Sequence, residues 1–511
     1  MDTLESLIKD FDAGISERAN WIERWDECYK LAMPGRTRFY DTAPGQSLTD
    51  EIFDSTAVES TAEFASRMQA GMTPPFARWF SLVAGSEIEE REKQRVNEEL
   101  DLVSDYVWES MNQSNLNQEL HECYIDLAVG TAVLGVEEGD IINPLRFTAI
   151  PQQQVVLRNG PYGNPDKVYR HRELTYEQMR VIWPNGKFSN DIKGKGERDR
   201  EYKFFVIECV KRDWEEIGTE TYNFMVVIKD PASVVLEGRF VGEGSNPLLP
   251  FRWSKQSGET YGRGPLLNCM GDVRALNALV ELGLENLAMS ITGMWQADDD
   301  GIINPETIQL IPGTIIPRSP ASRGLEPLQS PSNFDAAQFS LKEYRHNVRK
   351  ALFNETLGTP EGTPMSAREV HERMADLART VGSAYGRLNT ELVTPLIRRV
   401  IHILKRRGDL ELPMVNGKEI KVQNISPLAQ AQHNEDVARV ARFLQLLNGG
   451  FGPQVTNVVV KAEEAAIYTA EKIGVPEKLM RDEAERAQLQ AAIAETQQIS
   501  SEQANASDLQ E

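Results

Sequence analysis

A set of basic residues in the second half of the chain has the spacing needed to contact phosphate. Lys342, Arg345 and Arg349 recur at steps of three and four residues, so they share one side of a helix, and Lys350 follows directly. Lysine and arginine neutralise phosphate groups, so this stripe would suit contact with a nucleic-acid backbone. The same spacing also suits a solvated helix face that pairs with acidic neighbours. The residues alone leave both interpretations open.

Sequence patterns that would support catalysis are missing. No GxxxxGK[ST] loop is present, and the Gly-Lys-Gly stretch at 194–196 lacks the spacing that cradles phosphates. His371 and Glu372 lack the second histidine of a zinc protease. The three aspartates at 298–300 are consecutive, whereas a cation site needs convergent ligands. We therefore expect no catalytic residue, no metal and no cofactor.

The cysteines and the hydropathy pattern bear on the compartment. Cys28, Cys123, Cys209 and Cys269 lie far apart without a CxxC pair, so we expect reduced thiols that fill space. No apolar run reaches the roughly 18 residues that span a bilayer. The start, MDTLESLIKD, lacks the basic and then apolar pattern of a signal peptide. We expect a protein of the cytosol or of a particle, with no membrane partner.

The chain is strongly acidic. It carries 55 lysines and arginines against 77 aspartates and glutamates, a formal net charge of −22 over 511 residues. A protein that holds DNA tightly usually presents a basic surface to the phosphates. The charge therefore argues against a sequence-reading DNA binder. It remains compatible with a conduit, in which acidic walls and a few basic rings let DNA slide.

The first 110 residues are predicted to be mainly helical. Apolar residues at helical spacing between Leu4 and Tyr29 predict one helix, which ends at the Met-Pro-Gly sequence of 33–35. Asp54 and Ser55 can cap a second helix, and a third is expected from about Glu87 to Met111.

From about residue 130 the pattern changes to strands. Short β-prone runs separated by glycine and proline predict an antiparallel, β-rich region out to about residue 255. Asn159-Gly160 is a favourable hairpin turn.

Two long helices around a proline-rich interval follow. The first, over 272–294, is apolar on several sides, which predicts neighbours on more than one face. Prolines interrupt 297–330, and the second helix, over 333–353, carries the basic set. The stretch 357–364 is a loop by composition, and Ser366 can cap a third helix to about Arg407.

This third helix and the residues after it are predicted with interruptions. Gly382, Gly386 and Pro395 should kink the helix. A β-like piece over 412–422 and a helical part from Pro427 follow, and the end is expected to be disordered.

Four segments resemble one known family. They are IFDSTAVESTAEFASRMQAGMTPPFARWFSL at 52–82, YGRGP at 261–265, NETLG at 354–358 and MSAREVHER at 365–373. Each motif is weak by itself, but their order and spacing also fit. The chain is similar to the head-to-tail connector (portal) family of short-tailed, T7-like double-stranded-DNA bacteriophages over most of residues 1 to about 450.

This resemblance implies an α+β, mainly helical, portal-type fold that assembles as a ring, most often of twelve subunits. It divides the chain into a wing at 1–260 (helical over 1–128, β-rich over 129–260), a first stem helix at 261–296, a clip at 297–331, a second stem helix at 332–357, a tunnel loop at 358–365, a long kinked helix and wing return at 366–425, a helical crown at 426–499 and a disordered tail at 500–511.

The resemblance also implies a function without catalysis. Such rings sit at one capsid vertex of the virion, assemble in the cytoplasm of the bacterial host, and pass double-stranded DNA without sequence specificity during packaging and ejection. The implied partners are the terminase large subunit, tail or adaptor proteins, and the major capsid and scaffolding proteins. The residues implied to face the channel are those of the tunnel loop, Gly358, Thr359, Pro360, Glu361, Gly362, Thr363 and Pro364. The basic stripe is offset from the apolar stripe of its helix by roughly 100°, so we predict that it also turns toward the channel if the apolar stripe packs on the first stem helix.

Two other classes of protein are weighed against this one. A packaging motor or nuclease subunit should carry a nucleotide-binding loop or a convergent acidic triad, and the sequence has neither. An internal scaffold protein would share the acidity but would not explain the order of helix, proline-rich interval and helix.

Overall fold

The computed structural model describes residues 3–36, 39, 49–85, 90–215, 219–292, 295–296, 326–327, 334–354, 381–412, 420–451, 459–473, 481, 486 and 489. The chain divides into two compact units. The first comprises 1–20, 64–264 and 359–511, and the second comprises 21–63 and 265–358. Residues 21–63, which the predicted division assigns to the wing, therefore cluster with the residues of the predicted stem.

The N-terminal helices confirm the sequence pattern. Helix α1 spans Leu4–Ala32 and ends immediately before Met33-Pro34, as predicted. Helix α2 spans Thr56–Met72, and Asp54 Oδ1 accepts a hydrogen bond from the Thr56 backbone N–H at 2.9 Å. The predicted cap is thus present. Helices α3 (Glu90–Asn112) and α4 (Leu116–Leu127) follow.

The β-rich region forms an antiparallel five-stranded sheet in the order β4-β5-β6-β7-β8. Its strands are β4 (Val155–Asn159), β5 (Pro165–Thr175), β6 (Lys203–Asp213), β7 (Thr221–Ile228) and β8 (Ser233–Val241). A hairpin joins β4 to β5 as predicted, but its turn lies one residue further on than Asn159-Gly160, because Asn159 still pairs with Pro165 and the Gly163 N–H donates to the Gly160 carbonyl at 3.1 Å.

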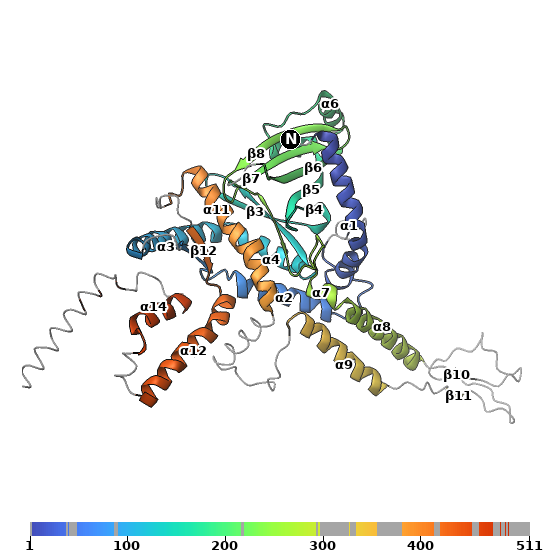
Figure 1. Ribbon diagram of the computed structural model, residues 1–511. Helices are drawn as coiled ribbons and strands as arrows, with labels where there is room; N and C mark the ends of the chain where they lie inside the picture. Colours follow the sequence, from blue (N-terminus) through green and yellow to red (C-terminus); the bar gives the residue numbers. More distant parts are fainter. Residues whose placement is uncertain are drawn as a thin grey trace, which may run out of the picture. The chain divides into compact units, whose positions relative to one another are not determined.

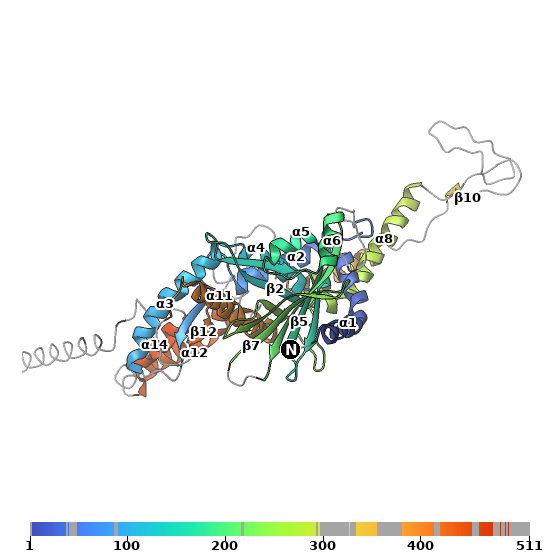
Figure 2. The ribbon, with the colours of Figure 1, turned by 90° about the horizontal axis from the view of Figure 1, so that it is seen from above.

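Helices cover both faces of this sheet, because alternate strand residues point to opposite sides. On one face, Leu7 and Phe11 of α1 pack against a cluster that includes Tyr169 and Ile207. The other face is covered by α5 (Tyr176–Ile182) and α6 (Asn190–Arg198), as Figure 2 shows. These two short helices are not predicted above. The capping box at Thr175 and Gln178 is the sequence signal for α5.

A second sheet has the order β3-β2-β9, formed by β2 (Thr131–Glu138), β3 (Leu145–Ile150) and β9 (Leu248–Arg252). Helix α4 packs on β2 and β3. Strand β1 (Phe80–Ala84) pairs with β12 (Ile420–Asn424), which lies far away in the sequence.

The long helix near residue 400 is irregular, as predicted. Residues 381–388 are α-helical, η2 (Asn389–Val393) is a π-helical turn, and α11 (Thr394–Arg407) continues to Gly408. The irregularity lies directly before Pro395, which lacks the N–H that would continue the regular pattern. The predicted start at Ser366 lies outside the described residues.

The C-terminal part described is helical, with α12 (Pro427–Phe451) packed against α14 (Ala462–Ile473). The predicted disordered tail lies outside the described residues. Among the helices that the structure describes, none is both long and apolar enough to cross a membrane. All four cysteines are buried, and none of them forms a disulfide.

Candidate functional site

The second unit contains the two helices that carry the predicted stem. They are α8 (Met270–Thr292), preceded by the short α7 (Pro265–Asn268), and α9 (Phe334–Ala351), and α8 packs against α9 (Figure 1). Val273 and Leu276 of α8 and Val348 of α9 are buried. Beyond α8, β10 (Trp295–Gln296) pairs antiparallel with β11 (Glu326–Pro327). The other residues of the predicted clip, including the aspartates at 298–300, lie outside the described residues.

Residues 281–288 of α8 are exposed on every side of the helix. The side chains of Leu282, Leu284 and Leu287 are 55%, 49% and 47% exposed. Successive helix residues are rotated by roughly 100°, so Leu284 and Leu282 point to different sides. This part of α8 therefore presents apolar side chains that the rest of the described chain does not cover.

A buried aspartate ties α9 to the start of α2. Arg345 donates from Nη2 and Nε to Asp54 Oδ2 at 2.8 and 3.0 Å. The Asp54 side chain is 5% exposed, and its other oxygen caps α2. Burial by itself would raise the pKa of Asp54, but the hydrogen bonds from Thr56 and Arg345 hold that pKa below its usual value. Arg345 therefore holds this part of α9 against the start of α2.

The predicted DNA-facing residues divide into two groups. Lys342, Arg349 and Lys350 are exposed on α9, whereas Arg345 is partly buried in the ion pair with Asp54. The role assigned to the set stays a prediction. For Arg345, the structure shows a carboxylate partner within its own unit. The predicted tunnel loop, 358–364, lies outside the described residues.

The YGRGP segment of the first unit lies tightly against residues 128–131. The Tyr261 hydroxyl accepts a hydrogen bond from the Leu157 N–H at 3.1 Å, and Gly262 N–H donates to Thr131 Oγ1 at 2.8 Å. A Cβ at Gly262 would lie 2.3 Å from the Gly130 carbonyl oxygen, and one at Gly264 would lie 2.0 Å from that of Ala128. Only glycine fits at these two positions. The motif therefore fixes the path of the chain immediately before α7.

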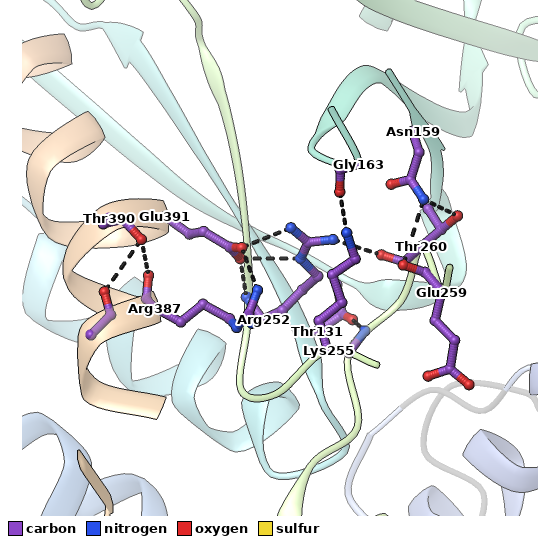
Figure 3. Close-up of polar contacts among 12 residues, drawn as sticks. Thr131, Asn159, Gly163, Arg252, Lys255, Glu259, Thr260, Arg387, Thr390 and Glu391 are labelled. Carbon is purple, nitrogen blue, oxygen red and sulfur yellow. Dashed lines mark hydrogen bonds and ion pairs between the residues drawn. The ribbon is translucent and has the colours of Figure 1, made fainter. Parts of the chain in front are cut away.

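A fully buried arginine joins this segment to the π-helical turn (Figure 3). Arg252 is 0% exposed, and its Nε and Nη2 donate to the Glu391 carboxylate at 3.1 and 2.7 Å. Its Nη1 donates to the Thr260 carbonyl at 3.1 Å, and Arg387 also reaches Glu391 at 3.2 Å. Sequence patterns miss this pair because its members are 139 residues apart.

An open cleft of about 740 Å³ lies beside this pair in the first unit. Asp166, Arg212, Glu220 and Arg398 are among its lining residues. In the part of the chain that the structure describes, no group of three or more histidines, cysteines and carboxylates could hold a metal ion.

Comparison with known proteins gives a consistent result. The family model described as "Bacteriophage head to tail connecting protein" matches residues 4–480. The portal protein of Salmonella phage epsilon15 is 24% identical over 450 residues, which cover 84% of this chain and 80% of that protein. The probable portal protein of Bordetella phage BPP-1 is 23% identical over 484 residues, which cover 91% and 86%.

Among solved structures, the neck of an empty GTA particle matches 82% of this chain and 90% of its own, at 13% identity and a TM-score of 0.35. A TM-score this low carries no weight.

Proposed function

Because the chain belongs to the family of bacteriophage head to tail connecting proteins, we propose that it is the portal subunit of a phage capsid. Identical copies would form a closed ring, of twelve in our proposal, at one capsid vertex. Double-stranded DNA would enter and leave the head through this ring. The ring would be structural, and a separate terminase motor would supply the energy for packaging.

The observation that carries the proposal is the exposed part of α8. Three leucines on different sides of a helix remain about half exposed although α8 already packs against α9. Burying apolar surface contributes roughly 25 cal/mol per Å², so exposed leucines favour association with further helices. A ring supplies identical helices on both sides of each α8, which suits an apolar surface that faces several directions.

The parts of the chain then take the following proposed roles. Helices α8 and α9 form the stem, and the segment between them forms the clip, where the terminase large subunit and later tail or adaptor proteins would dock. The sheets of the first unit and its helices α3, α4, α5, α6 and α11 form the wing, which would face the capsid and scaffolding proteins. Helices α12 and α14 form the crown.

Ring formation can be tested directly by native mass spectrometry and negative-stain electron microscopy of the purified chain. We expect a closed ring, and we expect Leu284→Gln with Leu287→Gln to reduce it to monomers and small oligomers. The matched control is Ile141→Gln, because Ile141 is 94% exposed but lies in the β2–β3 connection. Wild-type protein that stays monomeric over a wide range of salt and concentration would refute the proposal.

We further propose that Lys342, Arg349 and Lys350 contact DNA in the channel. All three are exposed on α9, in a chain whose net charge is −22. Salt screens such contacts, so each contact between a DNA phosphate and a basic side chain would be brief. The DNA could therefore still slide through the channel. Replacing the three residues by glutamine should preserve rings but change the packaging rate or DNA retention in a salt-dependent way. Normal packaging at every salt concentration would contradict this role.

A further inference from the structure

Two exposed surfaces of the first unit have opposite charge and matching apolar centres. We propose that the outer face of α3 in one subunit docks on the α5–α6 layer of the next copy of the chain. This inference rests on the proposed ring and specifies one of the contacts that would close it.

The first surface is the outer face of α3, defined by Glu98, Glu99, Leu102, Asp105, Tyr106 and Glu109. All six are exposed and recur at helical spacing, while Val103 and Val107 on the opposite side are buried. Residues 96–112 contain five acidic residues and no basic one. Arg78 pairs with Asp105 at 2.9 Å and Arg95 pairs with Glu99 at 3.9 Å, so part of the negative charge of this face is already compensated within the chain. Leu102, at the centre of this face, is 72% exposed. The face therefore combines a negative rim with an apolar centre.

The second surface is the α5–α6 layer, residues 176–203. It holds seven lysines and arginines against five acidic residues, an excess of positive charge in a chain of net charge −22. Lys187, Lys193, Lys195 and Arg198 are all exposed. Val181 is 79% exposed at the end of α5, where Trp183 turns inward to the core. This layer thus carries more basic than acidic residues, although its acidic residues are exposed too, and it presents one strongly exposed apolar side chain, Val181.

The charges determine which of the two surfaces can face each other between neighbouring copies. Two α3 faces brought together would oppose like charges, which costs free energy. Two α5–α6 layers would each bring an excess of basic residues to the contact. Only the pairing of α3 with α5–α6 matches charge and apolar surface. Because the two surfaces belong to different parts of the unit, such a contact is heterologous, and heterologous contacts generate rings when the rotation closes.

The placement of the two surfaces allows this. Both views show α3 and α6 at separate places on the first unit, with α3 at one edge (Figures 1 and 2). Helix α3 is anchored there, since its inner side packs on β1 and Arg78 holds Asp101 at 2.5 Å. The α5–α6 layer is fixed by its own packing on the sheet. A subunit can therefore use one surface for each neighbour.

Site-directed cross-linking of the full chain tests the contact. Leu102→Cys combined with Val181→Cys, treated with a short bis-maleimide, should convert assembled rings into a ladder of covalent multimers. The four native cysteines are buried, so only the new thiols should react. Leu102→Cys combined with Tyr162→Cys is the control, because Tyr162 is equally accessible but lies outside both surfaces. That pair should give no ladder.

Charge exchange provides a second test that does not depend on the linker. Glu98→Lys, Glu99→Lys and Glu109→Lys together should raise the concentration needed for ring assembly about ten-fold, through repulsion across the contact. Adding Lys193→Glu, Lys195→Glu and Arg198→Glu to the same chain should restore assembly. Circular dichroism melting shows whether each variant is folded.

The outcomes separate this inference from the proposed function. The docking of α3 on α5–α6 would be overturned if rings form but give no covalent ladder. It would also be overturned if neither charge reversal changes assembly. In both cases the portal proposal would stand. Wild-type chain that never forms rings would overturn both. A ladder with the Leu102 and Val181 pair, together with rescue by charge exchange, is the expected result.

Discussion

Two arginines show how differently the two units use charge and apolar surface. Arg252 in the first unit is completely buried and paired with Glu391, beside a sheet that helices cover on both faces. Arg252 is thus fully satisfied by groups of its own unit. Arg345 in the second unit, by contrast, is 41% exposed and pairs α9 with Asp54. The neighbouring helix α8 has leucines that remain about half exposed.

Removing Arg252 should have the largest effect. Arg252→Met leaves the Glu391 carboxylate with Arg387 alone, and breaking a buried pair costs about 3–5 kcal/mol of unfolding free energy. Urea unfolding of the full chain measures the loss. Arg252→Met with Glu391→Leu should recover part of it, because neither charge then stays buried alone. If the unfolding free energy of Arg252→Met lies within about 1 kcal/mol of the wild-type value, the buried pair does not distinguish the first unit from the second.

Removing Arg345 should have a smaller effect. Arg345→Gln leaves the buried Asp54 without its cation, for which we expect a loss of about 1–3 kcal/mol. The matched control is Arg349→Gln on the same helix, which should change stability by no more than about 0.5 kcal/mol because Arg349 is exposed. Equal effects of the two changes on urea unfolding would mean that the Asp54 ion pair does not anchor α9.

Acid should weaken the first unit through His171. Its ring stacks on Phe205 at a centroid distance of 5.4 Å, and burial lowers its pKa from 6.5 to about 4. The folded state keeps this histidine neutral, whereas the unfolded chain can protonate it. The stability that depends on the neutral ring is therefore fully present above pH 6.5 and is lost as the pH falls from 6.5 towards 4. His171→Phe should reduce the drop in melting temperature between pH 7 and pH 5 by about 2–4 °C. Identical pH profiles would exclude His171 as a source.

The smallest effect on the isolated subunit is expected from the exposed leucines. Leu284→Gln with Leu287→Gln should change the unfolding free energy by no more than about 0.5 kcal/mol, measured below the concentration at which rings form. The same variant should nevertheless fail to assemble. A large loss of subunit stability would show that these leucines already support the folded chain.

Helix bounds and caps depend on residues that are close together in the sequence, so they could be predicted from it. The helix α1, its end at Met33 and the cap at Asp54 are all local patterns, and the structure confirms them. The hairpin between β4 and β5 is also present, although its turn lies at 160–163 and not at Asn159-Gly160. The apolar excess of α8 is also visible in the sequence and agrees with its exposure.

Contacts between distant residues could not be predicted. The Arg252–Glu391 pair and the β1–β12 pairing join residues that no spacing rule relates. The Arg345–Asp54 pair likewise divides a basic stripe that looks uniform in the sequence. The helices α5 and α6 were missed because glycines and a proline interrupt their short apolar pattern, although Thr175 and Ser189 mark their starts.

The β1–β12 pairing has a consequence for biosynthesis. Ala84 pairs with Ile420, so the ribosome must add more than three hundred residues before β1 meets its partner. At about 5–20 residues per second, that interval is roughly 20–70 s. The whole of α8 and α9, with its exposed leucines, emerges during this time. Nascent chains on neighbouring ribosomes would therefore present these leucines to one another before β1 and β12 have paired.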